Sequence, residues 1–254
     1  MRRKIAHCDR SYSRSCAAGY TRFSGQNSKV LNSLEMTGRA QSHVFLTEDF
    51  RCLLDPSTSE ALRRMRDAAR EKGIDLGVVS GFRDFERQLS IWNAKFRGER
   101  LLLDRNSEPV DPGTLDPASR IDTILLWSAL PGASRHHWGT DFDVVDLARV
   151  STDDRVRLVS EEYAPGGLFG ELSAWLTEHM HTFGFFRPYR IDHGGVQPEA
   201  WHLSYAPAAT AILEALTVDV LREAIADAPI EGRTELLARL PELHARFVGG
   251  IDLP

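Results

Sequence analysis

An alternation of polar and apolar residues at 140–146 constrains the fold of this chain more than any other feature. If the segment is a strand, Phe142 and Val144 point to one side and pack inward, whereas Asp141 and Asp143 point to the other. The loop that precedes the segment carries two adjacent histidines and can reach the same face. The sequence therefore predicts a strand that displays two carboxylates beside imidazole groups.

A second strand is predicted at 201–205, where the apolar residues fall on one face and His202 and Ser204 on the opposite one. A strand in this position would hold the His202 imidazole rigidly. Glu199 lies shortly before it, and on a regular strand its side chain would diverge from that of His202. We therefore expect a turn or bulge at 198–200 that brings the carboxylate and the imidazole together.

Helical periodicity and capping residues around these strands indicate an α+β fold. Ser57 and Glu60 are spaced as a capping box for a first helix, and Asp84 can cap a second. Pro241 is expected to break the last helix, and Asp146 is expected to face solvent. The predicted helices cover residues 59–73, 84–98, 116–132, 170–185 and the tail after 207, and a further strand is predicted within 74–82.

The chain of 254 residues shows no internal repeat and no long low-complexity linker after its N-terminal part, so we expect one domain over residues 34–254. Its 31 basic and 36 acidic residues are well mixed and leave a formal net charge of -5. Such a surface lacks the basic stripe that binding to a phosphate backbone requires, which excludes nucleic acid as a partner. No window reaches the roughly 18 to 20 apolar residues that a transmembrane helix needs.

Residues 1–33 are basic and rich in serine but lack the apolar centre of a secretory signal, so we expect a disordered N-terminal extension with no export signal. One hypothesis is that translation starts near Met36. The cysteines, Cys8, Cys16 and Cys52, are odd in number and distant in sequence from the histidines. This pattern is typical of free thiols rather than of a disulfide framework or a thiolate metal site.

Two imidazoles and one carboxylate that converge on a cation form the ligand set of catalytic zinc, with a fourth position left for water. His136, Asp143 and His202 are the candidate ligands for one zinc ion per chain. Glu199 could then take a proton from bound water, whose pKa zinc lowers to about 7, and shuttle it to a leaving amine. His137 neighbours a proposed ligand but would point away from it, so its part in metal binding stays open.

Two other interpretations fit the same residues. Two histidines and one carboxylate also form the facial triad of mononuclear iron oxygenases. Those sites typically have a His-x-Asp spacing, however, whereas six residues separate His136 from Asp143, and Glu199 would have no role. A non-catalytic zinc-binding module for cell-wall peptide or a protein partner could keep the same scaffold, but the intact Glu199 argues against it.

Three motifs resemble those of the zinc D-alanyl-D-alanine carboxypeptidases and dipeptidases of the VanY and VanX type, which have a hedgehog-like peptidase fold. The segment from Ser134 to Asp143 is similar to the signature S-x-H-x-x-G-x-A-x-D, with Asp141 in place of the usual alanine. Residues 199–202 resemble the family's E-x-W-H. The segment "SGFR" at 80–83, with a glutamine shortly after it, resembles S-G-[FY]-R. All three motifs occur in the family's order.

This resemblance implies a small antiparallel sheet with helices packed around it, and it implies His136, Asp143 and His202 as zinc ligands. It also implies Glu199 as the catalytic base and Arg83 as the group that stabilises the oxyanion, because a guanidinium stays charged near neutral pH and donates in a fixed fork. Four further residues are expected on the substrate-binding side: Ser134, Gln88, Asp141 and Trp201.

The implied function is hydrolysis of a peptide bond next to a D-amino acid in peptidoglycan stem peptides, as a zinc D-alanyl-D-alanine carboxypeptidase. Asp141 departs from the signature, and its carboxylate could orient a metal ligand, narrow the pocket or recognise a cationic group. Peptidoglycan lies outside the cytoplasm, so an enzyme that acts on the intact wall would work in the cell envelope. Trimming of muropeptides in the cytosol would need no export signal.

Overall fold

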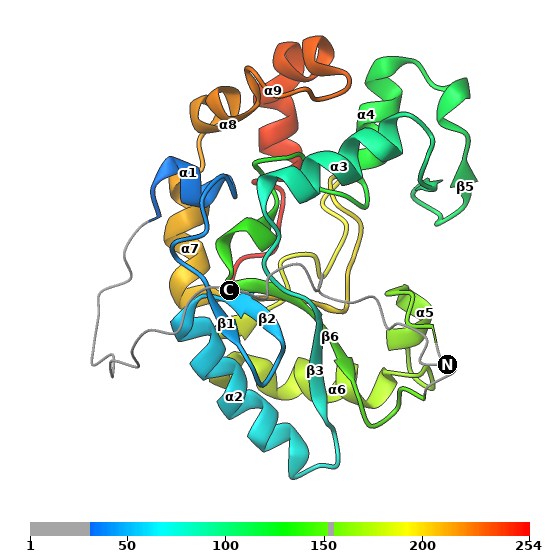
Figure 1. Cartoon of the computed structure of the whole chain (residues 1–254). Helices are drawn as coiled ribbons and strands as arrows, with labels where there is room; N and C mark the ends of the chain where they lie inside the picture. Colours follow the sequence, from blue (N-terminus) through cyan, green and yellow to red (C-terminus); the bar gives the residue numbers. More distant parts are fainter. Residues whose placement is uncertain (1–30, 152–154) are drawn as a thin grey trace, which may run out of the picture.

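The structure, a computed structural model, describes residues 31–151 and 155–254 (Figure 1). The predicted N-terminal extension lies outside the described residues, apart from its last few positions. Those positions belong to the fold, because helix α1 (Ser33–Met36) starts there with a capping box between Asn32 and Glu35. The described fold therefore includes residues 31–33, which were predicted to belong to the extension.

A four-stranded antiparallel sheet lies at the centre of the molecule. Its order is β3 (Leu76–Ser80), β6 (Asp141–Asp146), β8 (His202–Tyr205) and β7 (Phe185–Phe186). Two small antiparallel pairs add to it: β1 (Phe45–Thr47) with β2 (Cys52–Leu54), and β4 (Leu102–Leu103) with β5 (Pro109–Val110). The strands predicted from alternation, β6 and β8, are neighbours, and Asp143 pairs with His202. The predicted α+β class with a small antiparallel sheet is confirmed.

Helices pack on both sides of this sheet. Figure 1 shows α2 and α6 on one side, and α3, α4, α8 and α9 on the other. None of the helices in the described ranges is long and apolar enough to cross a membrane. The α-helices after α1 are α2 (Pro56–Arg70), α3 (Phe85–Phe96), α4 (Pro117–Leu125), α5 (Ser160–Tyr163), α6 (Gly170–His179), α7 (Ala206–Ala215), α8 (Val218–Ile225) and α9 (Arg233–Phe247), and short 3₁₀ helices are η2 (Pro112–Thr114), η3 (Arg135–Trp138) and η4 (Met180–Phe183).

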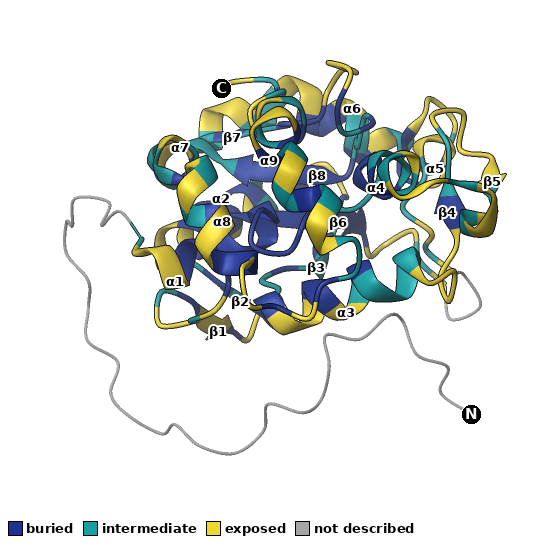
Figure 2. Ribbon diagram, turned by 90° about the horizontal axis from the view of Figure 1, so that it is seen from above, coloured by how far each residue is buried: buried dark blue, intermediate teal, exposed yellow. Residues whose placement is uncertain are grey.

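Two apolar cores hold the sheet between these helices. One core joins the inward face of β6 and β8, including Phe142 and Leu203, to α2 and α6. The other core joins α3, α4, α8 and α9 and includes Trp92 and Leu240. Figure 2 shows β6 and β8 as buried strands surrounded by these helices. The outward face of β6, which carries the aspartates, therefore looks toward the second core.

The start of α2 differs from the prediction. Asp55 is its N-cap, and the Asp55 carboxylate accepts hydrogen bonds from the Thr58 amide at 3.0 Å and from the Ser57 hydroxyl. The predicted capping box of Ser57 and Glu60 is therefore wrong. Pro56 favours this earlier start, since a proline at the first helical position has no amide that needs a partner. By contrast, Asp84 caps α3 as predicted.

Helix α4 was expected to continue to residue 132 but ends at Leu125. The carbonyls beyond this point bond to distant parts of the chain instead of continuing the helix. The Leu126 carbonyl accepts from the Gln197 amide at 2.9 Å, and the Ala129 carbonyl accepts from the Gln88 side chain at 2.6 Å. Tertiary hydrogen bonds thus replace the helical ones, and they lead the chain toward η3.

Two further expectations are wrong, the break of the last helix at Pro241 and the solvent exposure of Asp146. Pro241 lies inside α9, which continues through it with Leu240 and Leu243 buried on either side. A proline within a helix costs about 3 kcal/mol, which the burial of two leucine side chains at about 1.5–3 kcal/mol each can offset. Asp146 is buried rather than solvent-facing, and its carboxylate accepts a hydrogen bond from the Asp75 amide at 2.9 Å.

Candidate metal centre and active site

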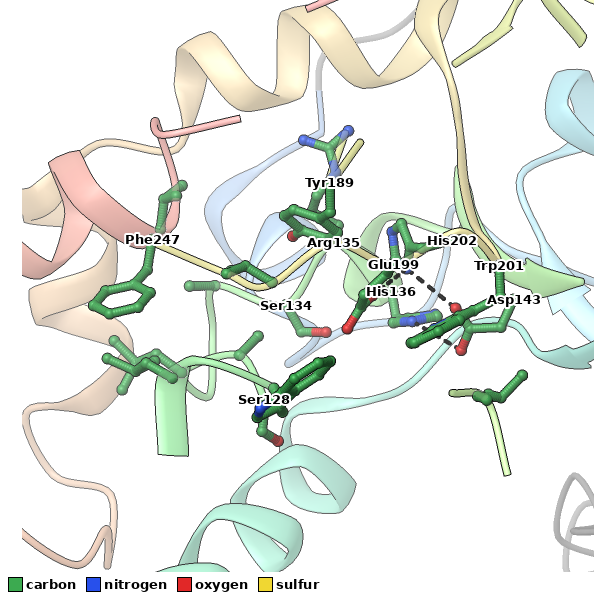
Figure 3. A pocket seen from close by; sticks show the side chains of 18 of the residues that line it. Ser128, Ser134, Arg135, His136, Asp143, Tyr189, Glu199, Trp201, His202 and Phe247 are labelled. Atoms are coloured by element: carbon green, nitrogen blue, oxygen red, sulfur yellow. Dashed lines mark hydrogen bonds and ion pairs between the residues drawn. The ribbon is translucent and has the colours of Figure 1, made fainter. Parts of the chain in front are cut away.

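The structure brings the three predicted metal ligands together. His136 comes from η3, Asp143 from the middle of β6 and His202 from the start of β8. One ligand atom from each lies within 4.8 Å of the others, and all three side chains are buried. Figure 3 shows these side chains converging, with Glu199 beside them.

The ring of His136 is oriented by the backbone. Its Nδ1 lies 2.9 Å from the Gly81 carbonyl, and its Nε2 lies 3.6 Å from a carboxylate oxygen of Asp143. A carbonyl can only accept, so Nδ1 carries the proton and Nε2 presents its lone pair to the site. Burial lowers the pKa of His136 to about 4, which keeps the imidazole neutral and able to bind a metal.

The ring of His202, which is on β8, lies between two carboxylates of the neighbouring strand β6. Its Nε2 is 3.1 Å from Asp141 Oδ1, and its Nδ1 is 3.1 Å from Asp143 Oδ1 and 3.6 Å from Glu199 Oε2. Burial alone would lower the pKa of His202, but the hydrogen bonds to both aspartates outweigh it and raise the pKa to about 10. A cation that binds Nδ1 must displace a proton, so metal uptake at this site releases protons.

The donor set and its spacing fit zinc. Zinc takes imidazole nitrogen and carboxylate oxygen at about 2.0–2.2 Å in a tetrahedral arrangement, which places neighbouring ligand atoms about 3.3 Å apart. Asp143 Oδ1 lies 3.1 Å from His202 Nδ1 and Asp143 Oδ2 lies 3.6 Å from His136 Nε2, so each oxygen of this carboxylate faces one of the imidazoles. Three protein ligands leave a fourth position for water, as catalytic zinc sites require.

Glu199 lies in a turn just before β8, as the sequence predicts. The His202 amide donates to the Glu199 carbonyl at 3.4 Å, and the Glu199 amide donates to the Tyr189 carbonyl at 2.8 Å. Burial raises the pKa of the Glu199 carboxyl to about 7, although the positive charges of His202 and Arg83 oppose that shift. A carboxyl with this pKa both accepts and releases a proton near neutral pH.

Arg83 reaches the same site from the segment after β3. Its guanidinium donates to Gln88 Oε1 at 2.7 Å and to Ser80 Oγ at 3.2 Å, and its backbone amide donates to the His136 carbonyl at 3.1 Å. Burial lowers the pKa of Arg83, while Asp143 opposes that shift, and a guanidinium stays charged near neutral pH in any case. The Gln88 side chain thus holds the Arg83 guanidinium in position.

A cavity of about 310 Å³ opens over these residues. Ser134 and Trp201, both predicted on the substrate-binding side, line it together with Arg83 and Glu199. Figure 3 shows the metal ligands at one end of this pocket and Phe247 at the other. Volumes of this size are typical of small-molecule sites.

Two of the predicted substrate-binding side chains do not line this pocket. Gln88 is fully buried and contacts Arg83. The Asp141 carboxylate is also fully buried, and it accepts hydrogen bonds from Arg135 at 2.7 Å, Thr140 at 2.7 Å and His202. Asp141 therefore lies behind a metal ligand, out of reach of a substrate in the pocket.

His137 is not part of the metal centre. Its Nδ1 lies 2.5 Å from the Arg83 carbonyl, and its Nε2 accepts a hydrogen bond from the Gly132 amide at 3.1 Å. Both ring nitrogens of His137 are thus hydrogen-bonded to backbone groups. The side chain ties the segment that carries Arg83 to the loop that leads into η3.

Some pocket residues have no clear signal in the sequence. Tyr189 lines the pocket from a loop, with its ring centroid 5.1 Å from that of His202. Leu221, Leu243 and Phe247 line it from the C-terminal helices. Arg135 could have been suspected, since it stands between two signature residues, but its pairing with Asp141 follows only from the fold.

Comparisons with known proteins show to which family this chain is similar. The family model described as VanY, D-alanyl-D-alanine carboxypeptidase, matches residues 51–208. An uncharacterized protein of Haemophilus influenzae is 31% identical over 121 residues, which cover 47% of this chain and 92% of that protein. A D-alanyl-D-alanine carboxypeptidase of Enterococcus faecalis is 29% identical over 155 residues, which cover 60% of this chain and 48% of that protein.

Solved structures of similar proteins include VanYB in complex with D-alanine-D-alanine. It is 23% identical to this chain with a TM-score of 0.48, and the match covers 76% of this chain and 87% of VanYB. The LdcB LD-carboxypeptidase is 22% identical with a TM-score of 0.47, and the match covers 74% of this chain and 80% of LdcB.

Proposed function

The chain belongs to the VanY family of D-alanyl-D-alanine carboxypeptidases, and on this premise we propose that it is a zinc peptidase that removes the terminal D-alanine from peptidoglycan stem peptides. The observation that carries the proposal is the convergence of His136, Asp143 and His202 with Glu199 beside them. A purely structural zinc site is closed by four protein ligands, whereas this one has three and a buried carboxylate at its edge.

Zinc bound by these three residues would lower the pKa of its water to about 7 and polarise the scissile carbonyl. The Glu199 carboxylate, which lies beside the three ligands, would take a proton from the attacking water and pass it to the departing amine. Its pKa of about 7 suits both steps, because the carboxyl is a competent base and a competent acid at the same pH.

Arg83 supports the developing oxyanion. Its guanidinium lines the pocket and is held by Gln88 and Ser80, so it needs little reorganisation when negative charge appears on the substrate. Arginine suits this role because it cannot lose its proton near neutral pH.

The shape of the pocket supports cleavage at the end of a peptide. Phe247 lies at the end of the pocket away from the metal ligands (Figure 3), Leu221 and Leu243 also line the pocket, and all three are buried. The pocket is also lined by the exposed residues Ser107 and Arg157. We take this buried, apolar end as the place where the substrate chain terminates, which favours a carboxypeptidase over an endopeptidase.

The proposal is tested by mass spectrometry of a stem pentapeptide that ends in D-Ala-D-Ala, before and after incubation with zinc-loaded protein. We expect the loss of one alanine and no other product. Release of the D-Ala-D-Ala dipeptide would instead indicate cleavage at the preceding peptide bond, which a carboxypeptidase does not cut. A pentapeptide that stays intact with fully zinc-loaded protein would contradict the proposed reaction.

A further inference from the structure

A buried group of polar side chains lies on the Nε2 side of the His202 ring, and one of its members, Arg135, also lines the pocket. Arg135 donates to Asp141 at 2.7 Å through Nε and to Ser204 at 2.7 Å through Nη2, and Thr140 donates to the other oxygen of Asp141. The charged side chains of this pair are almost inaccessible, with 4% of Arg135 and 0% of Asp141 exposed. Water therefore cannot stabilise either charge.

From this arrangement we infer that Asp141, paired with Arg135, is a positioning residue that fixes the orientation and tautomer of His202 for zinc. The inference rests on the zinc site of the proposed function. Both nitrogens of the His202 ring lie 3.1 Å from acceptor-only carboxylates, Nε2 from that of Asp141 and Nδ1 from that of Asp143. Asp143 is the proposed zinc ligand, and Nδ1 faces it and Glu199, so Nδ1 is the atom that zinc would bind while Asp141 holds the proton on Nε2.

The backbone register makes this geometry rigid. Across the β6–β8 ladder, Asp143 pairs with His202, and Asp141 pairs with Ser204. The His202 ring therefore stands between two aspartates of one strand, one of which acts as a metal ligand and the other as a hydrogen-bond acceptor. Such a carboxylate–histidine–metal arrangement orients the ring and increases the basicity of the metal-binding nitrogen.

Arg135 extends the same network to the other histidine ligand. It is adjacent in sequence to His136, and its guanidinium bridges Asp141 on β6 and Ser204 on β8. The guanidinium also packs over the Trp138 ring, 4.5 Å from the ring centroid. One arginine thus anchors η3, which carries His136, onto the two strands that carry the remaining ligands.

Arg135 and Asp141 depend on each other. The family signature has a small alanine at the position of Asp141, and with an alanine there the Arg135 guanidinium would be buried without a countercharge. Without Arg135, the Asp141 carboxylate would keep only the Thr140 hydroxyl and the His202 ring as partners. The two residues therefore act as one unit, specific to chains that carry both.

The test compares the variants Asp141→Asn and Asp146→Asn, which remove the same charge from the same strand. Asp146 is also buried, but its Oδ1 accepts from the backbone amides of Asp75 and Ala148, away from the histidines. Zinc affinity is measured on the purified full chain by competition with a chromophoric chelator. We expect zinc binding by Asp141→Asn to weaken about 10- to 100-fold and that of Asp146→Asn to match the wild type.

A double variant, Asp141→Ala with Arg135→Met, keeps the test decisive if Asp141→Asn fails to fold, because it removes both buried charges together. Thermal melting without zinc checks its fold, and its zinc affinity should again fall about 10- to 100-fold. Wild-type affinity in a folded double variant would overturn the inference while leaving the zinc site intact. A wild-type chain that binds no zinc would instead contradict the proposed function.

Discussion

The two ends of the pocket differ in chemistry and in origin. The metal end is polar and is built from residues of η3, β6, β8, the turn before β8 and the segment after β3, all within the segment 51–208 that matches the family model. The far end is apolar and is built by α8 and α9, which follow that segment. The difference suggests a division of labour, in which the metal end performs the family's chemistry and the C-terminal helices select the substrate.

The largest expected effect is at the metal end. Glu199→Gln removes the base but keeps the size of the side chain, so the rate of D-Ala release should fall about 10²- to 10⁴-fold. Zinc content should be unchanged, because Glu199 is not among the three ligands. Turnover and metal content are measured on the same preparation, and a variant with wild-type turnover would contradict the role of Glu199.

A slightly smaller loss is expected for Arg83→Lys. Lysine keeps the positive charge but not the fork that Gln88 and Ser80 hold in place, so kcat should fall about 10²- to 10³-fold. Gln88→Met is the matched variant, because it keeps Arg83 and removes the Gln88 hydrogen bonds to Arg83 and to the Ala129 carbonyl. We expect a smaller fall in kcat for Gln88→Met, and equal kcat values for both variants and the wild type would exclude Arg83 from oxyanion stabilisation.

The pH dependence of the reaction should follow Glu199. Because burial raises the pKa of this carboxyl to about 7, it is protonated below that pH and cannot accept a proton. With zinc occupancy held constant, kcat/KM should fall about tenfold per pH unit on the acidic side of pH 7. A profile of kcat/KM against pH measures this fall. A profile that stays flat down to about pH 5 would show that the catalytic base is a carboxyl with an ordinary pKa.

The smallest effect is expected for Phe247→Leu, which changes the apolar end of the pocket and leaves the metal end intact. The change enlarges the apolar end of the pocket, so the preference between D-Ala and a bulkier terminal D-residue should shift about tenfold toward the bulkier one. Zinc affinity should not change. Phe96→Leu is the matched control, since Phe96 packs against the same core without lining the pocket. An equal shift in both variants would mean that α9 does not select the substrate.

The metal end could largely be predicted from the sequence because its signals are local. Alternation at β6 placed Asp141 and Asp143 on one face, and the short distance in sequence between Glu199 and His202 required a turn. Capping by Asp84 was also visible in the sequence, since a cap depends only on the residues beside it.

The features that could not be predicted from the sequence depend on contacts between segments that are distant along the chain. Helix α4 ends early because Gln88 and Gln197 take carbonyls that would otherwise continue it. The position of Asp141 behind His202 depends on Arg135 and on the β6–β8 register. Nothing in the order of residues indicates that α9 would close the pocket with Phe247, because the packing of one helix over another leaves no local pattern.

Anomalous diffraction at the zinc absorption edge, from crystals of the zinc-loaded chain, tests the central claim most directly. We predict one strong peak per chain, about 2.0–2.2 Å from His136 Nε2, His202 Nδ1 and a carboxylate oxygen of Asp143, with Glu199 outside the coordination sphere. A peak bound by other residues, or no peak at these three in zinc-saturated crystals, would contradict the account.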